Sequence, residues 1–314
     1  MYQALYRKWR PQTFADVIGQ QHITDTLRAQ LQSGRLSHAY LFTGTRGTGK
    51  TTCAKILARA VNCEHPVNGD PCNECAACRG ILDGSVLDVT EIDAASNNGV
   101  DNIRDLRDET RYTPAQVRKR VFIIDEVHML SIGAFNALLK TLEEPPEHVL
   151  FILATTELHK VPATILSRCQ RFDFRRIGAE DISRRLLDVA AGEGIALTEG
   201  AARLIARLAD GAMRDALSML DRAAAAGAVD EKTVTAALGV MGQDDGIRLA
   251  EHLKTGDLAA AVGLLDEYYN AGRDLASVYD QMLGLIRDAL LVKTSKTDVS
   301  ALISPAYSVK TLQA

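Results

Sequence analysis

The stretch GTRGTGKT, residues 44–51, decides the fold of this chain. It matches the pattern G-x-x-x-x-G-K-[ST], in which glycines let the backbone wrap around a phosphate group while backbone N–H groups and a helix start face the negative charge. An apolar run, AYLFTG, precedes it, and a helical pattern, TTCAKILARAV, follows. The sequence therefore predicts a strand, a phosphate-binding loop and a helix in that order.

This loop predicts an ATP site with its Mg²⁺ ion. In such loops the lysine, here Lys50, reaches the β- and γ-phosphates, and the hydroxyl of the next residue, Thr51, binds the metal ion. The predicted nucleotide-binding residues of this region are Gly44, Thr45, Arg46, Gly47, Thr48, Gly49, Lys50, Thr51 and Thr52.

A second motif, VFIIDEVHML at 121–130, supplies carboxylates. Four apolar residues predict a buried strand that delivers Asp125 to its carboxyl end, beside the first strand, where it can hold Mg²⁺. Glu126 is then placed to orient the attacking water. Two acids that merely end a strand and cap a helix are the alternative, but the phosphate loop already requires both roles.

Two threonines end another apolar run, HVLFILATT at 148–156. Thr155 or Thr156 can place a hydroxyl near the γ-phosphate, and threonine is equally a common strand residue. Spacing does not decide between these interpretations. Arg168, at the start of the last apolar run, is by itself typical of a solvated surface group.

The order of patterns predicts an α/β fold. Apolar runs at 39–44, 86–94, 121–126, 148–156 and 170–175 alternate with helical patterns, which indicates a parallel five-stranded sheet covered on both faces. From residue 179 only helical patterns follow, separated by glycines. We expect a nucleotide-binding domain at 1–178, a helical lid domain at 179–242 and a third helical domain at 243–314.

Four cysteines form an insert soon after the loop, with the spacing C-x8-C-x2-C-x2-C. They are Cys63, Cys72, Cys75 and Cys78, and four thiolates are what a closed tetrahedral Zn²⁺ site requires. A redox pair would leave two of them unexplained. We therefore predict one structural zinc ion in a module at 62–80, with no part in catalysis.

Composition limits the partners. The 314 residues carry 36 basic and 40 acidic side chains, so a nucleic acid would have to meet a local basic surface. No secretory signal and no apolar run of about 18 residues is present. We expect a cytoplasmic protein without a membrane partner.

Longer segments carry a resemblance to a known family. They are RKWRPQTFADVIGQ, HAYLFTGTRGTGKT, the four-cysteine insert, EIDAASNNGVDNIRDL, IDEVHMLSIGAFNALLKTLEEPPEH, LATTELHKVPATILSRCQRF and DGAMRDALSMLD. In this order they resemble the gamma/tau family of bacterial DNA polymerase III clamp-loader subunits, which are AAA+ ATPases. The resemblance is close over residues 1–242 and looser beyond.

The resemblance implies a function within an assembly. Related subunits form a ring that, with ATP bound, opens the sliding clamp and grips primed DNA; hydrolysis then releases the clamp. Arg168 would act in trans, as an arginine finger in the neighbouring subunit's site, and Arg214 would be a second sensor carried by the lid. Thr155 or Thr156 would be the first sensor.

The resemblance also concerns the two ends of the chain. Tyr6, Arg10, Pro11, Val17 and Ile18 match a segment that packs near the adenine, although a hydrophobic anchor for the terminus explains them comparably well. The residues after 242 are fewer than the family's collar domain needs. We therefore expect a truncated collar, and a chain that is monomeric when alone.

Two other functions compete. A helicase or branch-migration motor would also carry a phosphate loop and DEVH, but no set of strand-separation motifs follows. A scaffold that uses ATP only as structural glue would be expected to lack the lysine, an acid or the second sensor. All of these are present here.

Overall fold

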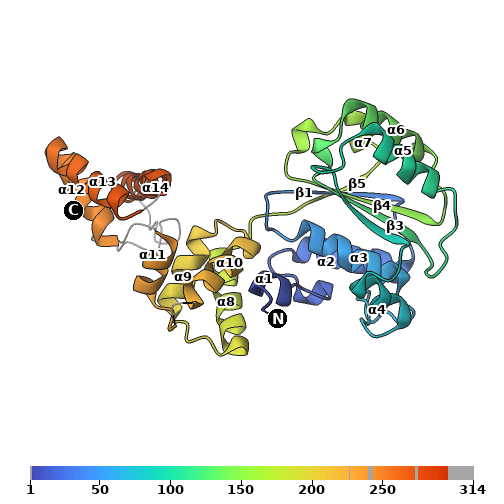
Figure 1. Ribbon diagram of the computed structural model, residues 1–314, viewed down its shortest axis with the longest axis horizontal. Coiled ribbons are helices and arrows are strands. Elements are labelled where there is room, and N and C mark those ends of the chain that lie inside the picture. The colour runs from blue at the N-terminus through green and yellow to red at the C-terminus, as the bar shows by residue number, and fades with distance from the viewer. Residues whose placement is uncertain (1, 226, 240–242, 273–274, 296–314) are drawn as a thin grey trace. The chain divides into compact units, whose positions relative to one another are not determined.

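The structure is a computed structural model that describes residues 2–225, 227–239, 243–272 and 275–295 (Figure 1). Its contacts divide the chain into two compact units. The first unit consists of residues 1–182 with 209–217, and the second of residues 183–208 with those from 218 onward. The candidate site lies in the first unit.

The first unit is built on a five-stranded sheet in which all neighbouring strands are parallel. The strands are β1 Ala39–Thr43, β2 Val89–Asp93, β3 Arg120–Asp125, β4 Val149–Thr155 and β5 Gln170–Asp173. Their order is β2-β3-β4-β1-β5. The five predicted strands and the α/β fold are confirmed. The expectation that β3 lies beside β1 is wrong, because β4 separates them.

Helices cover both faces of this sheet (Figure 1). Helices α2 Gln21–Ser33 and α3 Lys50–Asn62 pack on one face, and α5 Val100–Glu109, α6 Ile132–Glu143 and α7 Ala163–Leu166 pack on the other. Local signals set their ends: α2 stops at Gly34, where φ is 68°. The Ser131 hydroxyl accepts a hydrogen bond from the N–H of Ala134 and caps α6.

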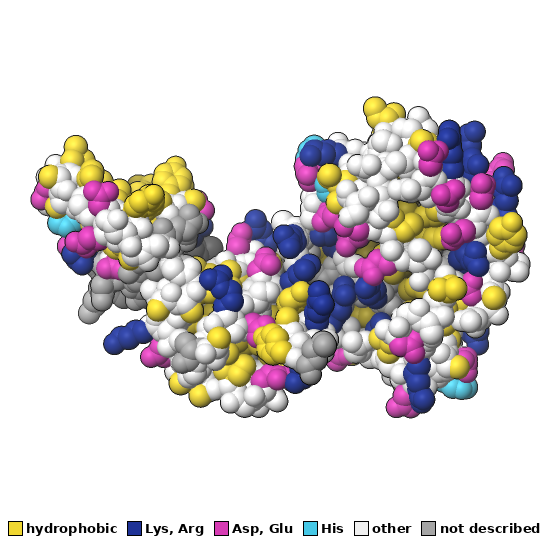
Figure 2. Space-filling model, in the orientation of Figure 1, with side chains coloured by type: hydrophobic (Ala, Val, Ile, Leu, Met, Phe, Trp, Pro, Cys, Tyr) yellow, Lys and Arg dark blue, Asp and Glu magenta, His cyan; other side chains and the backbone are white. Residues whose placement is uncertain are grey.

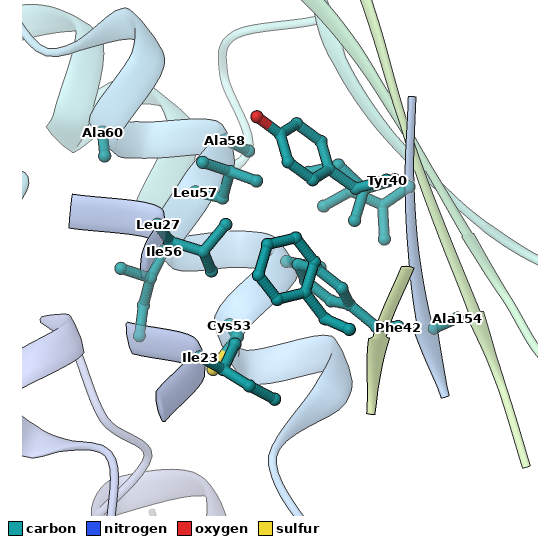
Figure 3. Packing of buried hydrophobic residues seen from close by; sticks show 14 of the residues in the cluster. Ile23, Leu27, Tyr40, Phe42, Cys53, Ile56, Leu57, Ala58, Ala60 and Ala154 are labelled. Atoms are coloured by element: carbon teal, nitrogen blue, oxygen red, sulfur yellow. The ribbon is translucent and has the colours of Figure 1, made fainter. Parts of the chain in front are cut away.

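Successive side chains of β1 point to opposite faces of the sheet and contribute to two separate hydrophobic cores. Tyr40 and Phe42 pack on the face covered by α2 and α3, whereas Leu41 packs on the opposite face. Figure 3 shows the first of these cores, with Phe42 beside residues of α2 and α3. Because β1 is buried on both faces, it fixes the position of the loop that follows it.

Short elements complete the first unit. They are α1 Leu5–Lys8, η1 Phe14–Asp16, α4 Ala76–Asp83, η2 Val127–Met129 and η3 Leu158–Lys160. Figure 2 shows basic and acidic side chains interspersed over the visible face of this unit. No field of a single sign covers that face, in agreement with the nearly balanced composition.

Helices make up the second unit. They are α8 Ala179–Glu193, α9 Glu199–Leu208, α10 Met213–Ala224, α11 Glu231–Leu238, α12 Gln243–Thr255, α13 Leu258–Asn270 and α14 Leu275–Thr294, of which α8 and α10 extend into the first unit. The last three share their own apolar cluster around Leu264 and Tyr268. Residues 273–274 and 296–314 of the expected third domain lie outside the described residues, as do 226 and 240–242 of the expected lid. Among the helices that the structure describes, none has the length and apolar character needed to span a membrane.

Candidate functional site

The loop after β1 has the backbone that its glycines predict. Gly44, Gly47 and Gly49 have φ angles of 143°, 77° and 106°, which side-chain-bearing residues rarely adopt. A Cβ atom on Gly44 would lie 2.4 Å from the carbonyl oxygen of Phe174. Backbone conformation thus favours glycine at all three positions, and lack of space requires it at Gly44 as well.

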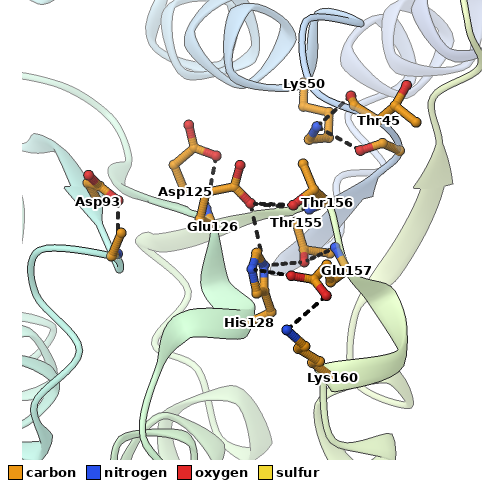
Figure 4. Close-up of polar contacts among 12 residues, drawn as sticks. Thr45, Lys50, Asp93, Asp125, Glu126, His128, Thr155, Thr156, Glu157 and Lys160 are labelled. Atoms are coloured by element: carbon orange, nitrogen blue, oxygen red, sulfur yellow. Dashed lines mark hydrogen bonds and ion pairs between the residues drawn. The ribbon is translucent and has the colours of Figure 1, made fainter. Parts of the chain in front are cut away.

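Lys50 opens helix α3 directly after this loop. Its ammonium donates hydrogen bonds to the carbonyl oxygens of Gly44 (2.8 Å) and Thr45 (2.9 Å), so the side chain folds back across the loop (Figure 4). Burial lowers the pKa of Lys50, and the carboxylates of Glu126 and Asp125 oppose that shift. Two backbone carbonyl oxygens therefore hold the Lys50 ammonium across the loop, and the two acids offset part of the effect of burial on its pKa.

The acidic pair meets the loop at the carboxyl edge of the sheet. Thr51 donates a hydrogen bond of 2.7 Å from its hydroxyl to Oδ2 of Asp125. The two residues predicted to hold Mg²⁺ are therefore in direct contact, and both offer the oxygen ligands that this ion prefers. Glu126 follows in a left-handed conformation, with φ at 48°, and its N–H donates to Oδ1 of Asp125.

The two threonines at the end of β4 differ in their contacts. Thr156 donates from its hydroxyl (2.9 Å) and its N–H (3.2 Å) to Oε2 of Glu126. Thr155 is fully buried, and its hydroxyl lies 3.0 Å from Nδ1 of His128. Thr156 is thus the one joined to the acidic pair (Figure 4).

The N-terminal segment lies against the same loop. Arg10 donates from Nε to the Thr52 hydroxyl (3.1 Å), and burial lowers the pKa of Arg10. A side-chain carbon of Val17 lies 4.0 Å from the position that a Cβ on Gly49 would take. Pro11 and Ile18 are partly buried in this segment.

Residues 209–217, which belong to the first unit, approach from another side. The Met213 N–H donates to the carbonyl oxygen of Gly47 (3.1 Å). The Arg214 guanidinium lies over the Tyr6 ring, 4.9 Å from its centre. Tyr6 of the N-terminal segment and Arg214 of α10, which lie far apart in the sequence, are therefore in contact.

Arg168 has a different set of partners. It donates to Oε1 of Glu143 (2.7 Å) and to the carbonyl oxygen of Thr164 (2.8 Å). These partners belong to α6 and α7, on the face of the sheet opposite α3. The structure therefore brings together Lys50, Thr51, Asp125, Glu126 and Thr156, and holds Arg168 at a separate surface.

The four predicted metal ligands also come together. The sulfur atoms of Cys63, Cys72, Cys75 and Cys78 all lie within 4.8 Å of one another. Tetrahedral zinc with Zn–S bonds of about 2.3 Å places its sulfurs about 3.8 Å apart, so the cluster fits the ion. The N–H groups of Glu74 and Cys75 lower the pKa of Cys72 to about 6, whereas burial raises the pKa values of Cys63 and Cys78. A bound cation is what would hold all four as thiolates.

The cysteine module is anchored to the N-terminal segment through Asp70. Its Oδ2 accepts two hydrogen bonds from Arg28 of α2 (3.1 and 2.8 Å), and its Oδ1 accepts one from the N–H of Phe14 (2.5 Å). Asn73 and Arg59 add contacts with the carbonyl oxygen of Gln12. The module thus touches the segment that leads to Val17.

Comparisons with known proteins place the chain in a family. The family profile described as DNA polymerase III, delta subunit matches residues 19–178, and the profile of the DNA polymerase III clamp loader subunit ATPase lid domain matches 181–229. A third profile, DNA polymerase III subunits gamma and tau domain III, matches 229–313. The DNA polymerase III subunit gamma of Buchnera aphidicola is 43% identical, over 90% of this chain and 79% of that protein. This chain belongs to the gamma/tau family of DNA polymerase III subunits.

Longer members of the gamma/tau family are also similar. DNA polymerase III subunit tau of Bacillus subtilis is 55% identical over 94% of this chain and 53% of that protein. The tau subunit of Escherichia coli is 47% identical over 94% of this chain and 46% of that protein. The chain spans about half the length of these two relatives.

Solved structures agree on the fold of the gamma/tau chain. The Thermotoga maritima RuvB Holliday junction branch migration motor matches with a TM-score of 0.57 at 17% identity, over 88% of this chain and 90% of that one. At this identity the likeness concerns the fold alone. It supports the AAA+ architecture and gives no preference for branch migration as the activity.

The structure adds residues of the gamma/tau chain that motif spacing does not predict. The buried Gln20 side chain accepts from the N–H of Arg175 (3.1 Å) and donates to its carbonyl oxygen (2.7 Å), which ties the N-terminal segment to the chain after β5. His128 and Glu157 join the acidic pair through the contacts described below. The only sequence signal for His128 is its place two residues after Glu126 in DEVH.

Proposed function

We propose that this gamma/tau chain is the ATP-hydrolysing motor subunit of the replicative clamp loader, within the DNA polymerase III holoenzyme. It opens the sliding clamp and loads it onto primed DNA, but does not itself polymerise DNA. The convergence of Lys50, Thr51, Asp125 and Glu126 at one edge of the sheet carries this proposal, because hydrolysis needs all four roles at one place.

Each residue has a role set by its chemistry. Lys50 neutralises the β- and γ-phosphate oxygens, while the loop N–H groups bind them. Thr51 and Asp125 would hold Mg²⁺, which supplies positive charge to the same oxygens when bound. Glu126 orients the attacking water and accepts its proton. Thr156 is the first sensor, since its hydroxyl contacts the Glu126 carboxylate.

Residues outside the loop make hydrolysis depend on assembly and on closure over the nucleotide. Arg168 reaches the γ-phosphate in a neighbouring subunit's site, and a finger of this kind contributes about 10³–10⁵ in rate. Its place away from Lys50 in this chain supports action in trans. Arg214 acts as the second sensor, and its neighbour Met213 is bonded to the loop.

The partners follow from this role. They are other clamp-loader subunits, the sliding clamp and primed-template DNA, in the cytoplasm. The adenine side of the site is lined by Tyr6, Arg10, Pro11, Val17 and Ile18. The hydrogen bond of Arg10 to Thr52 and the proximity of Val17 to Gly49 support this. The four cysteines hold one structural zinc ion, which supplies folding free energy to the module and does no chemistry.

Turnover of ATP in a reconstituted assembly tests the proposal. With partner subunits, clamp and primed DNA present, hydrolysis should be stimulated by clamp and DNA together, and Lys50→Ala should abolish this chain's share. Equal hydrolysis by Lys50→Ala and parent would favour a scaffold. Robust DNA unwinding without a clamp would favour a helicase and overturn the loader function.

A further inference from the structure

A cluster around His128 adjoins the acidic pair, and the roles proposed above do not use it. The His128 side chain is only 5% exposed. Its Nδ1 lies 3.0 Å from the Thr155 hydroxyl and 3.4 Å from Oε2 of Glu126, while its Nε2 lies 3.3 Å from Oε1 of Glu157 (Figure 4). Both ring nitrogens therefore face polar groups on β4 and the loop after it.

The contacts of His128, Thr155 and Glu157 form a closed loop. The Glu157 N–H donates to the Thr155 hydroxyl (3.0 Å), and the same hydroxyl is hydrogen-bonded to Nδ1 of His128 (3.0 Å). On the other side of the ring, Nε2 lies 3.3 Å from Oε1 of Glu157. Rotation of the ring would break the hydrogen bond at Nδ1 and the close contact of Nε2 with the Glu157 carboxylate.

The Glu126 carboxylate lies against this fixed ring. Its Oε2 accepts two hydrogen bonds from Thr156, and Nδ1 of His128 lies 3.4 Å away. The His128 ring thus occupies space into which Oε2 would otherwise move. A carboxylate that must orient a water molecule depends on this kind of support, since small displacements reduce the rate strongly.

The cluster also continues toward the segment that carries Arg168. Glu157 forms an ion pair of 2.8 Å with Lys160, at the end of η3. After η3 the chain enters α7, and Arg168 follows that helix, bonded back to the carbonyl oxygen of Thr164. His128 is therefore connected on one side to Glu126 and on the other to the loop that leads to Arg168.

We propose that His128 is a positioning residue for ATP hydrolysis in this chain. It holds the Glu126 carboxylate on Thr156 and ties it to the loop at 157–160. Movement of that loop, such as docking of the Arg168 segment on a neighbouring subunit would cause, is then transmitted to the Glu126 carboxylate. This inference rests on the proposed function, because it assigns His128 a part in the same reaction.

The test measures steady-state ATP hydrolysis in the reconstituted assembly with clamp and primed DNA. His128→Ala should lower kcat about tenfold and leave KM for ATP unchanged, because phosphate binding by Lys50 is not altered. His128→Asn keeps an amide near the position of Nδ1 and should recover part of the loss. His159→Ala is the matched control: His159 is 76% exposed, lies 3.7 Å from the same Glu157, and should leave kcat unchanged.

A double-mutant cycle separates positioning from general loss of structure. Glu157→Gln should lower kcat in the parent and have little further effect in His128→Asn, because both changes break one network. Because the cycle uses His128→Asn and Glu157→Gln, it still tests the role of His128 if His128→Ala fails to bind ATP. If the effects of the two substitutions on kcat were additive, or if His128→Ala had the same kcat as His159→Ala, the inference about His128 would be overturned. The proposed function would still stand. A parent without turnover would overturn the proposed function and this inference with it.

Discussion

Replacing Asp70 with asparagine tests whether the cysteine module braces the N-terminal segment. Asp70 accepts three hydrogen bonds, two from the Arg28 guanidinium and one from the Phe14 N–H. An amide has one oxygen and one NH₂ group, so it can satisfy either Arg28 or Phe14 but turns a donor toward the other. The perturbation removes charge and one set of bonds while it preserves the size of the side chain.

The magnitude follows from these contacts. A hydrogen bond to a charged group contributes about 1.5–3 kcal/mol. The Asp70 and Arg28 side chains are 13% and 25% exposed, so solvent screens the pair only in part. We expect a loss of about 2 kcal/mol in the free energy of unfolding of the first unit. For a unit of this size that corresponds to a fall in Tm of about 4–8 °C.

The assay is thermal unfolding followed by tryptophan fluorescence. The sequence has a single tryptophan, Trp9, just before the braced segment, so its emission reports on that region. Asp25→Asn is the matched control, because Asp25 lies 3.8 Å from the same Arg28 but is 71% exposed. If Asp70→Asn unfolded at the same temperature as Asp25→Asn, the bracing role would be refuted.

Three further predictions concern the zinc site, the Asp88 carboxylate before strand β2, and the proposed arginine finger Arg168. Cys75→Ser should reduce zinc from one ion per chain to none, by elemental analysis, while nucleotide still binds at Lys50; zinc-free parent protein would contradict this. Burial raises the pKa of Asp88, but hydrogen bonds from the Gln116 N–H and Arg120 lower it more. The Asp88 carboxylate therefore stabilises the fold at neutral pH. It ceases to do so as the pH falls below about 3.9, the pKa of aspartate in the unfolded chain. Asp88→Asn should therefore cost about 2 kcal/mol in urea unfolding at pH 7 and progressively less below pH 4; a cost independent of pH would contradict the assignment. Arg168→Ala should leave ATP binding by its own chain intact and lower assembly turnover at least about 10³-fold at the site it serves, whereas unchanged turnover would exclude a finger.

Most of the features that could be predicted from the sequence lie in short local motifs. The phosphate loop could be predicted because its glycines and Lys50 lie within eight consecutive residues, and the backbone there follows from their chemistry. The cysteine cluster was predictable for a similar reason, since three of its ligands share one short repeat. Both depend little on the rest of the fold.

Non-local pairing was harder to predict. The position of β4 between β1 and β3 depends on which strands pair across long crossovers, and apolar runs alone do not encode that order. Strand alternation indicates that Thr155 and Thr156 point to different sides, but not which one meets Glu126. The contacts of Asp70 with Phe14 and of His128 with Glu157 likewise join residues from separate elements.

Counting loaded clamps shows directly whether this nucleotide site drives clamp loading. The measurement is the number of sliding clamps placed on primed circular DNA by the reconstituted assembly, with the parent chain or with Lys50→Ala in the same complex. We predict ATP-dependent loading with the parent and almost none with Lys50→Ala. Equal loading by the two assemblies would show that the nucleotide site around Lys50 does not drive the reaction.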